Sequence, residues 1–149
     1  MMYIEIKKAN QLNINEANKL LTKLIRDEKK YDSNINEKYV VKHYYENRPK
    51  NSVILFAYVD KKIAGYTYGI LEDTQTYINK KLLIDALYVE EEFRNNGIAT
   101  ALLNAVEEWG KEQGAKVEEL TVCKENEKAF NLYKKFDFDT IVYRMTKNI

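Results

Sequence analysis

The pattern of apolar and polar positions predicts regular elements from the start of the chain. Residues 3–7 alternate apolar and polar side chains, which is typical of a half-buried strand. Apolar residues then recur at helical spacing from Ile14 to about Lys30. A preceding asparagine and a glutamate three positions later indicate a capping box at the start of this helix. The same start signal at Asn34 predicts a second, shorter helix, which ends before Pro49 because the residue before proline disfavours helix.

The middle of the chain is rich in β-branched and aromatic residues. Residues 53–59 and 63–70 flank a short polar turn and are predicted to pair as a hairpin, and residues 82–89 have the length of a buried strand. The elements expected after them are a helix over 97–114, a strand over 117–122, a helix over 127–136 and a final strand over 138–146. The order β-α-α-β-β-β-α-β-α-β predicts an α/β fold, a mixed central sheet with helices on both faces.

Composition narrows the class of protein. The chain has 149 residues, a natural size for one domain over residues 1–149, and it is 45% hydrophobic and 32% charged, as soluble globular proteins are. A net charge of +1 gives no support to a nucleic-acid partner. One cysteine excludes an internal disulfide and a zinc site built on several thiolates, and no metal is expected. Without an apolar run long enough for a signal peptide or a membrane span, we expect a cytoplasmic protein with no membrane partner.

The most informative segment joins the run 82–89 to the helix at Gly97. A buried strand ends there, a polar loop follows, and a helix opens at a glycine. Free N–H groups at a helix start, together with the helix dipole, form a site for phosphate oxygens. Gly97 and Ala99 leave room for a phosphate, Arg94 adds positive charge, and Thr100 offers a hydroxyl. Taken alone, the same pattern also fits an ordinary strand–loop–helix connection.

A second segment follows the strand at 117–122. Asn126 is a good helix cap, and the helix behind it carries aromatic residues at core spacing. Taken alone, this segment is a capped amphipathic helix whose tyrosine packs in the core.

Together the two segments resemble the GNAT acetyltransferase superfamily. The first matches its acyl-CoA motif, an Arg or Gln, two residues, a Gly, one residue and a Gly or Ala, in Arg94-Asn95-Asn96-Gly97-Ile98-Ala99. The second matches its Asn-x-x-Ala-x-x-Leu-Tyr motif, with Asn126, Ala129, Leu132 and Tyr133. The family usually ends this helix with Gly-Phe, where this chain has Asp137-Phe138. Aspartate tolerates a left-handed helix end at a small cost in stability.

The resemblance implies acetyl-CoA as co-substrate and a fold in which two neighbouring parallel strands separate. Here these are the strands that end at Val89 and Val122, the fourth and fifth, and pantetheine lies between them, bonded to the backbone of Leu87 and Val89. The pyrophosphate rests on the N–H groups that follow Arg94. The residues expected to contact the cofactor are Leu87, Tyr88, Val89, Arg94, Asn95, Asn96, Gly97, Ile98, Ala99, Thr100, Asn126 and Tyr133.

Proton balance then assigns two catalytic residues. A primary amine has a pKa near ~10.4 and must lose a proton before it can attack the thioester. We predict Asp85 as the base, since apolar neighbours should raise its pKa and strand alternation places it on the face of Leu87 and Val89. The alternative is that Asp85 is a structural residue that pairs with a lysine or a backbone N–H. Tyr133, placed near the cofactor sulfur by the resemblance, is the predicted acid for the departing thiolate.

The expected acceptor is an amine of a small molecule or peptide. Acidic and tyrosine side chains of the first two helices and of the loop after the hairpin suit a cationic amine, and they equally suit a solvated loop. These are Asp27, Glu28, Tyr31, Asp32, Glu72, Asp73 and Tyr77. His43 is interpreted as a surface or boundary residue on the second helix and Cys123 as packing.

Two other functions compete with acetyl transfer. The first is an acyl-CoA-binding module on the same fold without catalysis. The second is a nucleotide-binding regulator, although the loop lacks the P-loop ending and the three-glycine dinucleotide fingerprint. A homodimer is compatible with the sequence.

Overall fold

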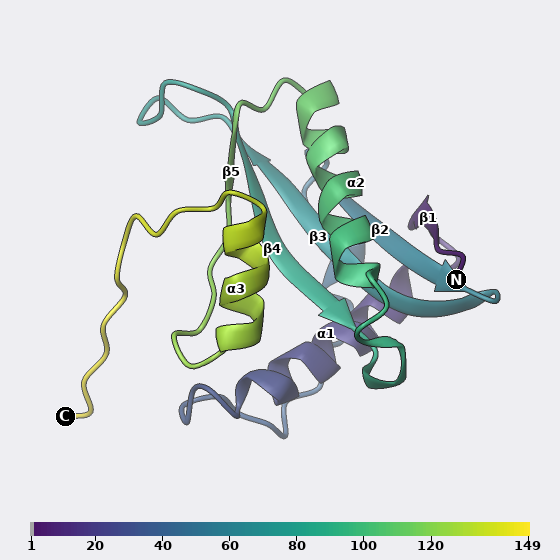
Figure 1. Cartoon of the computed structure of the whole chain (residues 1–149), viewed down its shortest axis with the longest axis horizontal. Helices are drawn as coiled ribbons and strands as arrows, with labels where there is room; N and C mark the ends of the chain where they lie inside the picture. Colours follow the sequence, from purple (N-terminus) through teal and green to yellow (C-terminus); the bar gives the residue numbers. More distant parts are fainter. Residues whose placement is uncertain (1) are drawn as a thin grey trace.

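The protein is described by a computed structural model over residues 2–149 as one mixed β-sheet with helices on both faces (Figure 1). The strands are β1 (Glu5–Lys8), β2 (Ser52–Val59), β3 (Lys62–Glu72), β4 (Lys81–Val89) and β5 (Val117–Glu119). They pair in chain order, antiparallel from β1 to β4 and parallel between β4 and β5. The predicted α/β fold class is confirmed.

Strand alternation divides the core between the two faces of the sheet. Helix α1 (Ile14–Glu28) and the short 3₁₀ helix η1 (Tyr45–Asn47) cover one face. Helices α2 (Ile98–Glu112) and α3 (Glu127–Lys135) lie on the other, and η2 (Glu91–Phe93) precedes α2. On the α1 face the sheet contributes Ile54, Phe56, Tyr66, Tyr68, Ala86 and Tyr88. On the α2 face it contributes Val53, Leu55, Ala57, Val59, Leu82 and Ile84.

The first helix starts where the pattern predicts, but without the predicted capping box. Asn13 is the N-cap residue of α1, and its side chain accepts a hydrogen bond from the Asn10 N–H at 2.8 Å instead of capping the helix. Glu16 bonds Lys19 at 3.0 Å. A local hydrogen-bonded turn of asparagines therefore precedes the first turn of α1.

The second predicted helix is wrong, because residues 35–44 form a loop and only η1 is helical. Side-chain bonds to the backbone compete with helix formation here, as in the bond from the Lys38 N–H to Asn36 Oδ1 at 3.1 Å. The Val41 N–H instead bonds Thr22 Oγ1 of α1 at 3.0 Å, and Val41 is buried. Tertiary contacts with α1 thus replace the helical bonds of this segment.

The final predicted strand is also absent, since residues 138–149 carry no helix or strand. Helix α3 ends as the sequence indicates: Asp137 adopts a left-handed φ of 67°, and the Phe138 N–H bonds the Tyr133 carbonyl at 3.1 Å. This is the bonding of a Schellman helix end. Among residues 2–149, no helix is long and apolar enough to cross a bilayer.

A carboxyl pair lies between β5 and α2. Glu118 and Glu107 line a cavity of about 160 Å³, and Glu118 Oε1 is buried without a donor partner. Burial, followed by the charge of Glu107 and a hydrogen bond to it, raises the pKa of Glu118 to about 7. Because this pKa is raised, Glu118 holds its proton to a higher pH in the folded protein than an exposed glutamate does.

We expect Glu118→Gln to stabilise the protein above neutral pH. The folded pKa lies above the unfolded value, so stability falls as pH rises from about 4.5 to about 7 and then stays level. An amide removes this cost, about 1–2 kcal/mol after solvent screening. The melting temperature should therefore rise by about 3–6 °C at pH 8 and change little at pH 5. Glu108→Gln, on the exposed side of α2, is the control; equal shifts in both variants would contradict the raised pKa of Glu118.

Candidate functional site

The parallel strands β4 and β5 separate after a short paired stretch. Their pairing ends at Leu83 and Glu119, while β4 continues to Val89. The chain after β5, residues 120–123, leaves the sheet without pairing to it. Beyond Leu83, the edge of β4 that faces β5 therefore has backbone groups without a strand partner. This opening between β4 and β5 is the gap in which the family resemblance places pantetheine.

The loop between β4 and α2 has the geometry of an anion site. Asn95 and Gly97 have left-handed φ values of 65° and 80°, and Gly97 is the N-cap residue of α2. The first bond of the helix runs from the Ala101 N–H to the Gly97 carbonyl at 3.0 Å. The N–H groups before Ala101 therefore point out of the helix start. A Cβ at Gly97 would have no atom within 4 Å, so the space in front of these N–H groups is open.

Arg94 has a different position from the one expected of a phosphate-binding side chain. Its Nε donates to the Val89 carbonyl at 2.8 Å, and its Nη2 bonds Asp27 Oδ2 of α1 at 2.8 Å. The guanidinium lies 5.4 Å from the centre of the Tyr88 ring. Arg94 therefore fastens the loop to the α1 face, and its backbone remains beside the anion site.

Lys128 is a basic residue at this loop that sequence reasoning missed. Its Nζ donates to Asn95 Oδ1 at 2.6 Å, from the first turn of α3. A lysine in the first turn opposes the helix dipole, which is the signal that could have drawn attention to it. The side chain places a positive charge beside Asn95, two residues before Gly97.

Asn126 and Tyr133 lie on α3, as predicted. Asn126 Oδ1 accepts from the Ala129 N–H at 3.2 Å, so the cap is confirmed and only its amide nitrogen is left to bind a ligand. Tyr133 packs against the α2 face of the core, with its ring edge-on to Phe138. Burial, and then the charge of Glu28, raises the pKa of Tyr133 to about 12. Glu28 belongs to α1, on the opposite face of the sheet.

Asp85 lies at a β-bulge, and the predicted alternation is wrong at this point. Ala86 pairs with Tyr68 and Ile84 with Gly69, so Asp85 has no partner on β3. Leu87 and Val89 pack on the α2 face, whereas the charge of Asp85 acts on tyrosines of the α1 face. Asp85 reaches solvent beside the gap, and partial burial raises its pKa.

Acidic side chains gather around Asp85 on the α1 face. Burial raises the pKa of Glu28, the charges of Asp32 and Asp85 raise it further, and the charge of Arg144 opposes them. Tyr44 is half exposed, and its pKa is raised by burial and by the charge of Asp85. Three carboxylates, Glu28, Asp32 and Asp85, therefore influence one another on the α1 side of the gap, with Arg144 as the opposing positive charge.

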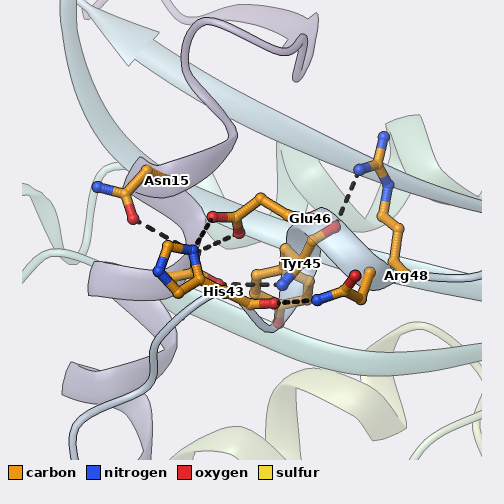
Figure 2. Close-up of polar contacts among 7 residues, drawn as sticks. Asn15, His43, Tyr45, Glu46 and Arg48 are labelled. Atoms are coloured by element: carbon orange, nitrogen blue, oxygen red, sulfur yellow. Dashed lines mark hydrogen bonds and ion pairs between the residues drawn. The ribbon is translucent and has the colours of Figure 1, made fainter.

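A polar network fixes the loop that carries Tyr44 (Figure 2). Asn18 of α1 donates to Glu46 Oε1 at 2.6 Å and accepts from the Tyr45 N–H at 3.1 Å. His43 lies on this loop with a left-handed φ of 54°, and its Nδ1 is 3.1 Å from Glu46 Oε2. The histidine is a surface residue, as expected, although its predicted helix is absent.

The other predicted acceptor residues do not join these carboxylates. Asp27 is bonded to Arg94, and Tyr77 stacks on Lys81 with the Nζ atom 3.6 Å from the ring centre. Glu72 ends β3, and the loop between β3 and β4, which begins at Asp73, lies at the opposite end of the sheet from α1 (Figure 1). Residues 2–149 contain no group of three side chains suited to a metal ion.

Comparisons with known proteins agree with this geometry. The model of the family described as "Acetyltransferase (GNAT) family" matches residues 18–138. An uncharacterized N-acetyltransferase of Methanocaldococcus jannaschii, MJ1207, is 39% identical over 56 residues, 38% of this chain. The chain's match spans about a quarter (25%) of the length of that relative.

Solved structures share the fold at low sequence identity. A mutant of the BH1408 protein from Bacillus halodurans superimposes with a TM-score of 0.84 at 22% identity, over 97% of this chain and 99% of that one. The aminoglycoside acetyltransferase meta-AAC0020, from an uncultured soil sample, gives 0.79 at 14% identity, over 99% and 97%. The aminoglycoside N-acetyltransferase AAC(6')-Iy, in complex with CoA, gives 0.74 at 14% identity, over 100% and 96%.

Proposed function

Because the chain belongs to the acetyltransferase (GNAT) family, we propose that it transfers the acetyl group of acetyl-CoA to a primary amine by direct attack in a ternary complex. One observation carries this proposal. A helix start with free N–H groups, an unpaired strand edge and a phenol lie around the same gap, with carboxylates at its other side.

The residues present fit acetyl-CoA. The open space at Gly97 and the N–H groups of Gly97, Ile98, Ala99 and Thr100 suit the pyrophosphate, with Lys128 supplying charge. The edge of β4 at Leu87 and Val89, where the Val89 carbonyl already accepts from Arg94, suits the amides of pantetheine, and the Asn126 amide nitrogen is available at the start of α3. Tyr88 of β4 and Asn96 of the loop before α2 are proposed to contact the cofactor as well.

Proton movement defines what Asp85 and Tyr133 would do. Asp85, in its ionised form, would accept a proton from the ammonium group of the acceptor, directly or through water, and burial raises its pKa toward that of a better base. The free amine forms a bond to the thioester carbon, and the carbon–sulfur bond breaks. Tyr133, which is protonated at neutral pH, gives its proton to the departing thiolate, and the phenolate then takes up, through solvent, the extra proton of the new amide nitrogen.

The acceptor class follows from the charge around the gap. Glu28, Asp32 and Asp85 favour an amine that carries positive charge before reaction. We propose a small cationic amine with more than one amino group. The two aminoglycoside acetyltransferases with the same fold act on molecules of that kind.

A pair of glycine variants tests cofactor binding. We expect Gly97→Ala to weaken acetyl-CoA binding at least tenfold in calorimetry, because the methyl group enters the space proposed for a phosphate. Gly114→Ala is the matched control, since its φ of 90° imposes the same backbone strain away from the gap. Equal affinity in both variants and the parent would place the cofactor elsewhere.

Turnover separates the enzyme from a binding module. The parent protein is incubated with acetyl-CoA and a panel of mono- and polyamines while free thiol is measured. Acetyl-CoA binding in calorimetry with no thiol release on any amine would favour the non-catalytic acyl-CoA-binding module.

A further inference from the structure

The loop between β4 and α2 is held from one side by helix α1. Arg94 Nη2 in this loop bonds Asp27 Oδ2 of α1 at 2.8 Å. One turn earlier on α1, Lys23 Nζ bonds Glu90 Oε2 at 2.6 Å. The two α1 residues are four positions apart, so they lie on the same side of the helix. Two ion pairs of opposite polarity therefore join one side of α1 to the loop that is proposed to hold the pyrophosphate.

Apolar packing does little to fix this loop. An open groove of about 470 Å³ lies between α1 and the loop, and its lining is Lys23, Tyr88, Glu90, Glu91 and Glu92. Of the loop residues 90–97 none is fully buried, and Phe93 is the one that packs against the core on the α2 face. A segment with few buried contacts opens easily unless polar contacts hold it. The two ion pairs across the groove supply such contacts.

The backbone that follows Arg94 needs this support. Asn95 has a left-handed φ of 65°, a region that non-glycine residues seldom occupy. The Arg94 side chain is fixed on three sides, by Asp27, by the Val89 carbonyl at 2.8 Å from its Nε, and by the Tyr88 ring at 5.4 Å. The N–H groups proposed to bind pyrophosphate follow directly in the chain. Fixing the Arg94 side chain therefore also fixes the start of the segment that carries them.

The charges of the two pairs fit the same role. Glu90 stands at the start of the loop, where an unpaired carboxylate would repel an approaching phosphate, and Lys23 offsets its charge. Asp27 lies in the last turn of α1, where a negative charge opposes the helix dipole. An aspartate at this position does not favour the helix itself. Its bond to Arg94 gives it a use in the loop instead.

We propose that Asp27 and Lys23 of α1 are positioning residues of the cofactor site, because their ion pairs hold the β4–α2 loop in the conformation that presents its N–H groups to the pyrophosphate. This role rests on the proposed binding of acetyl-CoA. It differs from the acceptor role that the sequence pattern suggests for Asp27. Asp27 acts on the cofactor through Arg94 and does not contact the amine.

Kinetics and calorimetry of a full-length Asp27→Asn protein test this role. The Kd of acetyl-CoA should rise about tenfold, since apparent affinity falls with the fraction of the loop that is competent to bind. The KM of acetyl-CoA should rise with it, while kcat at saturating cofactor and the KM of the amine stay at parental values. Asp27→Glu keeps the charge and should recover part of the affinity. Lys23→Gln should act in the same direction but more weakly, because its pair is more exposed.

The control is Glu16→Gln, which breaks the exposed ion pair with Lys19 on the same helix and should bind acetyl-CoA as the parent does. A double-mutant cycle shows whether the effect passes through Arg94. In an Arg94→Gln protein the further change Asp27→Asn should leave the affinity unaltered, because the partner is already gone.

Hydrogen exchange measures the loop without any cofactor. The N–H groups of residues 93, 94 and 101 donate backbone hydrogen bonds within the loop and at the start of α2. In Asp27→Asn these amides should exchange with deuterium at least about threefold faster than in the parent, and in Glu16→Gln they should not change. Parental exchange in Asp27→Asn would overturn the positioning role.

Three results with acetyl-CoA would also overturn it. The first is parental affinity in Asp27→Asn. The second is tighter binding, which would make Arg94 a phosphate ligand that Asp27 restrains. The third is a raised KM for the amine with unchanged cofactor affinity, which would return Asp27 to the acceptor side. Failure of the proposed function looks different, because the parent itself would then bind no acetyl-CoA, and the positioning role would fall with it.

Discussion

Replacing Tyr133 by phenylalanine should lower kcat at least about tenfold and leave acetyl-CoA affinity nearly unchanged. The substitution removes one oxygen and keeps the ring that packs against the α2 face and Phe138. Proton donation typically contributes ~100- to 10,000-fold to a rate. The bond to sulfur matters most as charge develops, so the loss falls on kcat rather than on binding.

Steady-state kinetics on an amine that the parent acetylates well checks this prediction, with calorimetry for acetyl-CoA. Tyr39→Phe is the control, because Tyr39 is an exposed tyrosine on the loop after α1. Parental kcat in Tyr133→Phe would show that the tyrosine is a packing residue. A tenfold loss in both variants would point to a general effect on folding, which the melting temperature would also report.

The strands could be predicted from the sequence because burial leaves a strong pattern in it. The hairpin and the strand over 82–89 alternate or run apolar for their whole length, and their observed bounds differ by one or two residues. Helix α2 follows from its apolar stripe and from the two glycines that flank it, Gly97 and Gly114, both of which have positive φ. In each case local pattern and tertiary environment agree.

The failures occur where tertiary contacts decide the structure. The segment before η1 has apolar residues at helical spacing, but Thr22 bonds the Val41 N–H and Asn18 bonds the Tyr45 N–H. Hydrogen bonds between residues far apart in the sequence leave no signal in the local pattern of apolar and polar positions. The tail has a strand pattern, but a strand forms only where an edge accepts it.

The candidate site was predictable in its motifs and not in its side-chain geometry. The motif around Gly97 fixes the loop, whose left-handed residues and free N–H groups follow from local sequence. Whether Arg94 turns to a phosphate or to Asp27 depends on α1, far away in sequence. The bulge at Asp85 is likewise set by the register with β3, and it reverses the face that alternation predicts.

Replacing Asp85 by asparagine should remove the acid limb of the pH–rate profile. The carboxylate accepts a proton only when ionised, so in the parent kcat/KM should rise as pH passes upward through the raised pKa of Asp85. Asparagine keeps the shape and cannot accept the proton. The rate should fall about 100-fold near neutral pH and recover in part at high pH, where free amine is abundant.

The control for this substitution is Asp73→Asn, an exposed aspartate at the opposite end of the sheet, which should leave the profile unchanged. Binding and base catalysis can also be separated. If Asp85 only attracts a cationic amine, Asp85→Asn should raise KM for the amine and leave kcat and the acid limb intact. That result would show that water or another group removes the proton of the amine. The carboxylates around the gap would still select the acceptor.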